Sequence, residues 1–298
     1  MQLSASCMVC LLDKQLRDIK DYSDETKKAA YLQAVMGAIA SADRDVSAPY
    51  MTSIINGIHE EYFGFREDLS QEKSRHNHMM LRVADDIARE IGASRDGVEM
   101  ALRYARAGNY IDLGALSEVK NEVLLNMLRE AKDAPVDGVQ YAYFREELAR
   151  AGSLLYIMDN AGEIVMDMLL IRELKKAYPH LAITALVRGK LTSNDATPFD
   201  AREIGLDREV RVIDNGTDIP GTELKRISPE AREACLSADV ILAKGQANFE
   251  TLLGEGLNAF YIFLCKCDWF VKRFGLPRFT GVFIREKDVK IGKYLIGV

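Results

Sequence analysis

Motifs that define several large protein classes are missing from this sequence of 298 residues. No run of about 18 apolar residues occurs, so no segment predicts a membrane-spanning helix. The 39 lysines and arginines are fewer than the 45 acidic residues, and this balance does not favour binding to nucleic acid. The first residues also lack the charged and apolar regions of a signal peptide. We therefore expect a cytoplasmic protein with neither a nucleic-acid nor a membrane partner.

Three motifs of nucleotide-binding proteins and hydrolases are absent as well. The turn after the first predicted strand lacks Gly-x-Gly-x-x-Gly and carries acidic groups instead, which disfavours a dinucleotide site. No Walker A sequence occurs, and no nucleophile elbow offers a serine or cysteine. Of the reaction types considered, metal-assisted chemistry remains.

The five cysteines are an odd number, which argues against a secreted disulfide framework. Cys7 and Cys10 form a Cys-x-x-Cys pair, which is half of a zinc-ribbon pattern. One interpretation is two partly buried thiols at the start of a helix. Another is that Cys265 and Cys267 join them in space as a structural Zn²⁺ site or a redox-sensitive clasp. A catalytic dithiol is disfavoured because no thioredoxin-like strand precedes Cys7.

The chain divides by pattern into two regions, 1–150 and 151–298. In the first, apolar residues recur at helical spacing, as at Tyr31, Val35 and Ile39, and the polar segment 67–75 predicts a loop or a solvated helix end. In the second, short apolar runs alternate with amphipathic segments, which predicts a Rossmann-like, mostly parallel, doubly wound α/β sheet. The predicted strands are 153–158, 182–187, 209–213, 238–243 and 260–265, with 281–285 as a sixth at an edge.

Polar residues follow the predicted strands, and the carboxyl edge of a parallel sheet is where ligands bind. Carboxylate and amide oxygens suit a hard divalent cation, and the amides of a helix start suit a phosphate, so we predict a metal-and-phosphate site here. The segments concerned are Asp159-Asn160-Ala161-Gly162-Glu163, Asn194-Asp195, Asp214-Asn215-Gly216 and Lys244-Gly245-Gln246-Ala247-Asn248.

Each of these segments also has a simpler explanation. Asp159 and Asn160 are suited to cap the following helix, and Asp195 to form a turn. The Asp214-Asn215-Gly216 segment is so typical of a turn that we favour that interpretation. Lys244 precedes a glycine after an apolar strand, so we expect solvent or an anion to receive it. The four histidines show no convincing metal-ligand spacing.

The sequence resembles the metal-dependent damage-control phosphatases, a family catalogued as domain of unknown function 89, and within it the compact prokaryotic branch. The resemblance covers nearly the whole chain and implies a helical part packed on a Rossmann-like part. The motifs that carry it are Cys7-x-x-Cys10, Gly108-Asn109-Tyr110-Ile111-Asp112, Asp159-Asn160-Ala161-Gly162-Glu163, Asn194-Asp195-Ala196-Thr197 and Lys244-Gly245-Gln246-Ala247-Asn248-Phe249-Glu250.

The resemblance implies a phosphatase of small phosphorylated metabolites that uses Mn²⁺, Mg²⁺, Co²⁺ or Ni²⁺. It implies that Asp159, Asn160 and Asp195 bind the metal, that Lys244 lies near the substrate phosphate, and that Asp159, Asp195 and Lys244 are the catalytic residues. The residues expected to contact the substrate are Lys244, Asn109, Asp112, Glu163 and Asn194.

Two other functions stay open at this point. A branch of the family carries a description as an S-adenosylmethionine-dependent carboxyl methyltransferase, although the glycine-rich turn of such enzymes is missing here. A metal- or nucleotide-binding module without turnover is the other alternative. Whether water or Asp159 attacks the phosphorus, which metabolite is the substrate, and the oligomeric state are not determined by the sequence.

Overall fold

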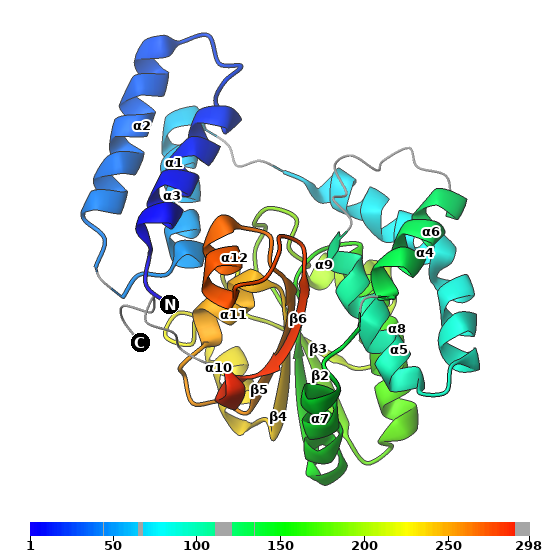
Figure 1. The fold of residues 1–298 in the computed structure, drawn as a ribbon. Coiled ribbons are helices and arrows are strands. Elements are labelled where there is room, and N and C mark those ends of the chain that lie inside the picture. The colour runs from blue at the N-terminus through cyan, green and yellow to red at the C-terminus, as the bar shows by residue number, and fades with distance from the viewer. Residues whose placement is uncertain (44, 65–67, 111–120, 134, 290–298) are drawn as a thin grey trace.

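The protein is described by a computed structural model that places residues 1–43, 45–64, 68–110, 121–133 and 135–289 (Figure 1). Within these ranges no helix is both long and apolar enough to cross a bilayer. The helices before the sheet are α1 (Ala5–Asp18), α2 (Glu25–Ala40), α3 (Ala48–Phe63), α4 (Ser70–Ala93), α5 (Gly97–Ala107), η1 (Gly108–Tyr110), α6 (Asn121–Lys132) and α7 (Gly138–Arg150).

A six-stranded sheet occupies the second half of the chain, with the strand order β3-β2-β1-β4-β5-β6. All neighbouring strands pair in parallel except β5 and β6, which are antiparallel. The strands are β1 (Ser153–Ile157), β2 (Ala182–Val187), β3 (Arg211–Asp214), β4 (Val240–Lys244), β5 (Ala259–Leu264) and β6 (Gly281–Arg285). The helices between them are α8 (Glu163–Ala177), α9 (Pro198–Glu203), η3 (Leu206–Arg208), α10 (Pro229–Ser237), α11 (Gln246–Leu252), α12 (Asp268–Phe274) and η4 (Glu286–Asp288). The predicted doubly wound α/β fold is confirmed.

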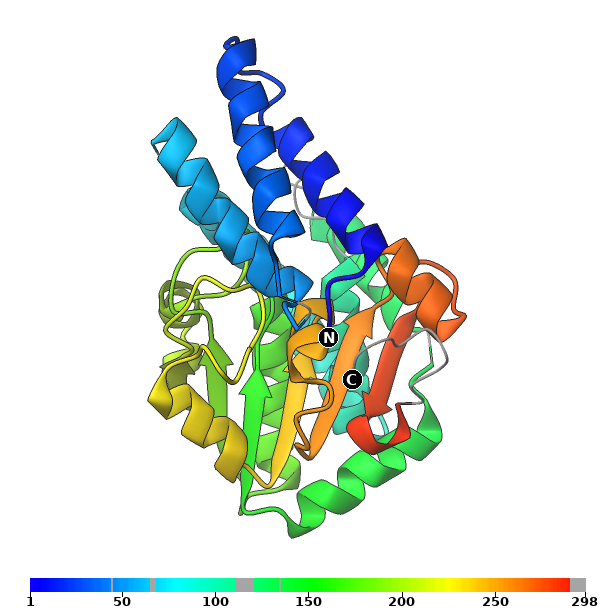
Figure 2. The ribbon, with the colours of Figure 1, turned by 90° about the vertical axis from the view of Figure 1, so that its left-hand side faces the viewer.

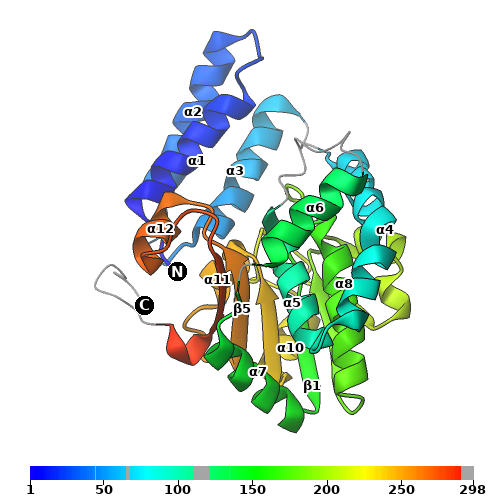
Figure 3. The same cartoon turned by 45° about the vertical axis from the view of Figure 1, so that its right-hand side comes forward.

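Both faces of the sheet are covered, which explains why its strands read as continuous apolar runs rather than alternating ones. In β1, Leu154 and Tyr156 pack into the core shared with α4, α5 and α8, whereas Leu155 and Ile157 pack into the core shared with α10, α11 and α12. Figure 3 shows these two groups of helices on opposite sides of the strands. The sheet is therefore the middle layer of three.

The helices of the first half of the chain pack into two separate hydrophobic cores. Helices α1–α3 bury a small core of their own around Tyr31, Val35 and Ile55, and they extend away from the sheet (Figure 2). Helices α4–α7 instead contribute to the larger core on one face of the sheet. Short polar residues begin several of these helices, since Ser4, Asp24 and other caps accept a hydrogen bond from an amide of the first turn.

Helix α7 is held to the sheet by an aromatic cluster whose loss we expect to destabilise the fold. Phe144 is fully buried, and its ring centroid lies 5.0 Å from that of Phe260 and 5.6 Å from that of Phe283. Phe144→Ala should lower the free energy of unfolding by about 3–5 kcal/mol, measured by urea titration. Val139→Ala on the same helix should change it by less than about 0.5 kcal/mol, because Val139 is 59% exposed. Equal effects of the two changes would contradict this account of α7.

Candidate functional site

The candidate site lies where the order of the strands reverses, between β1 and β4. The chain leaves β1 towards β2 on one side and leaves β4 towards β5 on the other, which opens a crevice at their carboxyl ends. Asn248 joins these ends, because its Nδ2 donates to Met158 O at 3.0 Å and to Lys244 O at 2.7 Å. Asp159 follows β1 directly, and Gly245 follows β4.

Two loops at this edge are tied together by backbone contacts. Asn160 and Asp195 form an isolated antiparallel bridge. Ala161 N donates to Asn194 O at 2.9 Å, and Ala196 N donates to Asp159 O at 2.8 Å. These contacts bring together the three residues predicted as metal ligands, Asp159, Asn160 and Asp195. The first and the last are 36 positions apart in the sequence.

The Asp159 carboxylate is held by neutral amides. Its Oδ2 accepts from Asn109 Nδ2 at 3.1 Å and from Asn160 Nδ2 at 2.8 Å. The pKa of Asp159 is raised to about 7, first because the carboxyl is buried and then because Glu163 and Asp195 carry the same charge nearby. This carboxylate is thus crowded by negative charge, and no cationic side chain that the structure describes forms an ion pair with it.

Glu163 lies one helical turn beyond Asp159, as the sequence predicted, and shares its partners. Its Oε2 accepts from Asn109 Nδ2 at 2.7 Å and from Asn160 Nδ2 at 3.0 Å. Burial acts to raise the pKa of Glu163, but the contact with the ammonium of Lys244 outweighs burial and lowers it. Glu163 is therefore held as a carboxylate beneath the site.

We expected solvent or an anion to receive Lys244, and carboxylates do receive it, but the expectation that it avoids the core was wrong. Lys244 is fully buried, and its Nζ donates to Glu163, to Asp167 Oδ1 at 2.7 Å and to Ala105 O at 2.9 Å. The reason is the alternation of β4, which places Lys244 on the same face as Val240 and Leu242, against α8. Glu163 and Asp167 are four residues apart on α8 and so meet Lys244 from one side.

A second buried cation supports Asp195. Arg188 is fully buried, its Nε donates to Asp195 Oδ2 at 2.7 Å, and its Nη2 donates to Asn248 Oδ1 at 3.1 Å. Burial raises the pKa of Asp195, and the guanidinium of Arg188 offsets part of that rise. Arg188 therefore fixes the orientation of Asp195 relative to the end of β4.

Other predicted residues fall outside this cluster. Asp112 lies outside the described residues. Asn194 contributes its backbone carbonyl to the loop contact described above, and Asp214 Oδ1 accepts from Gly216 N at 2.9 Å, which confirms the turn interpretation of that segment.

The cysteines do not gather as a four-thiol site in the structure. All five thiols are free: Cys10 is exposed, Cys7 and Cys267 are half-buried, and Cys265 is buried in the core against α12. Cys267 is close enough for its charge to contribute to the raised pKa of Cys7, after burial as the main cause. Cys265 and Cys267 pack against the same core cluster, and after burial Cys267 adds to the rise in the pKa of Cys265.

Sequence reasoning missed two charged groups at the site. Arg188 directly follows β2 and was not among the predicted site residues. Lys266 follows β5, is exposed, and lies near enough to lower the pKa of both Asp159 and Glu163 by its charge. The rule that polar residues after parallel strands gather at one edge would have found Lys266 had it been applied to the fifth strand.

The residues present fit a divalent cation. Among the described residues, four buried carboxylates, Asp159, Glu163, Asp167 and Asp195, have direct ion pairs with two buried cations, Lys244 and Arg188, so negative charge is in excess. Over the described ranges, no three His, Cys, Asp or Glu side chains gather closely enough to hold a metal ion on their own. A site here therefore needs the Asn160 amide oxygen as its third protein ligand, beside Asp159 and Asp195.

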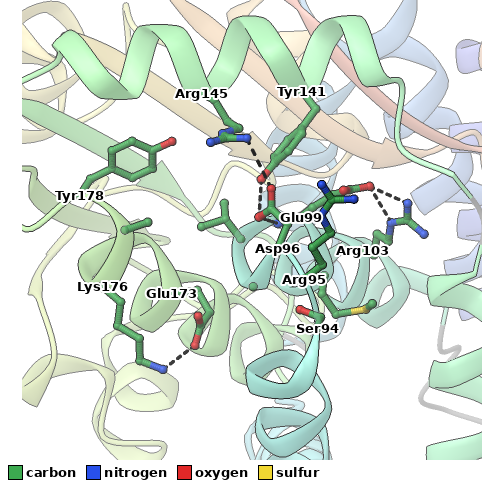
Figure 4. Close-up of a pocket in the computed structure, with 14 residues that line it drawn as sticks. Ser94, Arg95, Asp96, Glu99, Arg103, Tyr141, Arg145, Glu173, Lys176 and Tyr178 are labelled. Carbon is green, nitrogen blue, oxygen red and sulfur yellow. Dashed lines mark hydrogen bonds and ion pairs between the residues drawn. The ribbon is translucent and has the colours of Figure 1, made fainter.

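A cavity of about 840 Å³ lies at the other end of α8 (Figure 4). Its lining includes Tyr141 and Arg145 of α7 and Glu173 of α8, and Glu173 is about 15 Å from Glu163 along that helix. Most of its charges pair internally, as in the ion pairs Arg103–Glu99, Arg145–Asp96 and Lys176–Glu173. We assign it no part in the candidate site.

Gly245 permits the close approach of β4 to Asp159. Its φ is +82°, and an added Cβ would lie 2.2 Å from Asp159 Oδ2. Gly245→Ala should displace the carboxylate and weaken Mn²⁺ binding by about tenfold or more, measured by titration calorimetry on chelator-stripped protein. Gly256→Ala is the matched control, because Gly256 has a φ of +74° but no atom within 4 Å of an added Cβ. Unchanged Mn²⁺ affinity in folded Gly245→Ala would refute the assignment of Asp159.

The chain is similar to known proteins over most of its length. A damage-control phosphatase of Pyrococcus horikoshii is 30% identical over 293 residues, which are 96% of this chain and 99% of the relative. A damage-control phosphatase of Archaeoglobus fulgidus is 28% identical over 275 residues, 90% of this chain and 93% of the relative. The crystal structure of a DUF89 family protein from Pyrococcus horikoshii has a TM-score of 0.84 at 27% identity, and the match covers 96% of this chain and 99% of that one.

A model of the damage-control phosphatase ARMT1-like domain matches residues 3–280, which is most of the chain. The resemblance noted from the motifs is thereby confirmed, and the chain belongs to the damage-control phosphatase ARMT1-like family.

Proposed function

We propose that this protein is a divalent-metal-dependent phosphatase that hydrolyses small phosphomonoesters, such as sugar phosphates or damaged phosphorylated metabolites. The observation that carries the proposal is the backbone bridge between Asn160 and Asp195, which joins the loop of Asp159 to the loop of Asp195 at the strand-order reversal, where buried carboxylates gather. The membership of the chain in a phosphatase family supports the reaction type.

In this proposal Asp159, Asn160 and Asp195 hold the metal, which is Mn²⁺, Mg²⁺, Co²⁺ or Ni²⁺. A bound divalent cation supplies Lewis-acid stabilisation to the phosphate oxygens and to an attacking water. Asp159 acts as a ligand rather than as the nucleophile. Its Oδ2 is engaged by Asn109 and Asn160, and Ala161 stands where a second acid of an aspartyl-phosphate motif would be.

The surrounding side chains have supporting roles. Lys244 is a positioning residue that keeps Glu163 ionised, and Glu163 in turn aligns the amides of Asn109 and Asn160. Arg188 orients Asp195. Lys266, which is exposed and close to the carboxylates, takes the place that the sequence analysis gave to Lys244 as the lysine that contacts the substrate phosphate.

The metal ligands can be tested by isosteric substitution. Asp159→Asn and Asp195→Asn should each lower metal-dependent kcat by about 100-fold or more while the protein stays folded. Phosphate release from a panel of sugar phosphates, with Mn²⁺, Mg²⁺, Co²⁺ or Ni²⁺ restored after chelation, measures this. Asp214→Asn is the control, since Asp214 is a carboxylate at the same sheet edge whose turn contact an amide oxygen can keep.

Two results would contradict the proposal. Retained turnover in both variants would show that Asp159 and Asp195 are not metal ligands of the reaction. A wild-type protein that binds Mn²⁺ but releases no phosphate from any member of the panel would favour a binding module without turnover.

Lys266 has a separate test, because a residue that contacts the phosphate should affect substrate binding. Lys266→Gln should raise KM for a phosphomonoester by about tenfold, the loss expected for one charge-assisted hydrogen bond. Lys266→Arg should restore part of the affinity, and Lys272→Gln should leave KM unchanged, because Lys272 is an exposed lysine on the neighbouring helix α12. An unchanged KM in Lys266→Gln would show that Lys266 does not contact the substrate phosphate.

A further inference from the structure

Helix α4 reaches both loops that carry the predicted metal ligands. The helix lies against α8 and α9 (Figures 1 and 3). Its residues Lys73 and Asn77 are four positions apart and so share one helical face. Lys73 is 2% exposed and Asn77 is fully buried, although the polar segment around Lys73 was predicted to be solvated. Both side chains point into the molecule rather than into solvent.

Asn77 contacts the first of these loops through its carbonyl. Gly162 N donates to Asn77 Oδ1 at 2.6 Å. Gly162 has a φ of 77° and begins α8, and no side chain of its own caps that helix. An amide at the start of a helix lacks an intrahelical partner, so Asn77 supplies the acceptor that the turn 159–162 needs.

The same side chain contacts the second loop through its amino group. Asn77 Nδ2 donates to Asp200 Oδ1 at 3.0 Å and to Glu203 Oε2 at 2.6 Å. Asp200 Oδ2 accepts from Thr197 N at 2.8 Å and pairs with Lys73 Nζ at 2.8 Å. Asp200 therefore caps α9 directly after the loop 194–197 that contains Asp195.

These contacts make one continuous brace from Lys73 through Asp200 and Asn77 to Gly162. Lys73 forms an ion pair with the fully buried Asp200, which also accepts from Thr197 N. Asn77 uses its acceptor on one loop and its donors on the other, which fixes the separation of the two loops. A hydrophobic side chain of the same size cannot make either contact.

We propose that Asn77 is a positioning residue that sets the spacing of Asp159 and Asp195, with Lys73 and Asp200 holding it in place. This inference rests on the proposed metal site at Asp159, Asn160 and Asp195, but the brace itself consists of contacts outside that site. Groups that orient metal ligands without touching the metal commonly affect affinity by about 10- to 100-fold.

The experiment compares Asn77→Leu and Asn77→Ala with wild type, using Ser74→Ala as the matched control. Ser74 is on the same turn of α4 and also contacts Glu203, but it touches neither Gly162 nor Asp200. We expect the Mn²⁺ dissociation constant, from calorimetry on chelator-stripped protein, to rise by about tenfold or more in both Asn77 variants. Ser74→Ala should stay within about twofold, and excess Mn²⁺ should restore most of kcat in Asn77→Ala.

Hydrogen exchange of the metal-free proteins separates this inference from the proposed function. The Gly162 amide, followed in a peptide covering 158–165, should exchange faster in both Asn77 variants. Its exchange rate in Ser74→Ala should equal that of wild type. Mn²⁺ affinity within twofold of wild type in a folded Asn77 variant, or unchanged exchange at Gly162, would overturn the proposal. If wild type binds no Mn²⁺, the proposed metal dependence falls, and the exchange rates still decide whether the brace exists.

Discussion

The neutralisation of buried carboxylates is the constraint on which this structure depends. An ionised group removed from water without a partner costs several kcal/mol, so the four acids behind the sheet edge require cations beside them. Lys244 forms ion pairs with Glu163 and Asp167, and Arg188 forms an ion pair with Asp195. Among the described residues Asp159 has amide donors as its direct partners, and its pKa is the one of these four that rises to about 7. The unbalanced charge is thus concentrated at the position where we propose that the metal binds.

The helices of the first half complete a site that the sheet alone leaves open. Asn109, which follows α5, donates to both Asp159 and Glu163, and the Ala105 carbonyl on α5 accepts a hydrogen bond from Lys244 Nζ. Asn77 on α4 reaches the turn that begins α8. Because these partners come from elements remote in sequence, the packing of α4 and α5 against α8 and the geometry of the carboxylates are coupled.

Much of the fold was predictable because its signals are local. The strands were predicted within a few residues, since each is a short apolar run flanked by turn residues. Because both faces of the sheet are buried, these runs are continuous and easy to recognise. The gathering of Asp159, Asn160 and Asp195 followed from the rule that parallel strands end at one edge. Lys244 was misjudged because a glycine after it suggested exposure, while the register of β4 against α8 turns it inward. Asn77 gave no signal, because an asparagine in the middle of a polar helix looks the same whether it faces solvent or a neighbouring loop.

The amino-acid sequence by itself determined the alternation of strands and helices, the acidic and amide side chains after the strands and the edge of the sheet at which they meet, because each of these follows from residue type and short-range periodicity. Tertiary structure decided which charges are buried and which partner each one has. Lys244 pairs with Glu163 and Asp167, Arg188 pairs with Asp195, and Lys266 stays exposed beside them. Those pairings depend on how α4, α5 and α8 pack on the sheet, and side chains far apart along the chain become neighbours only when that packing forms.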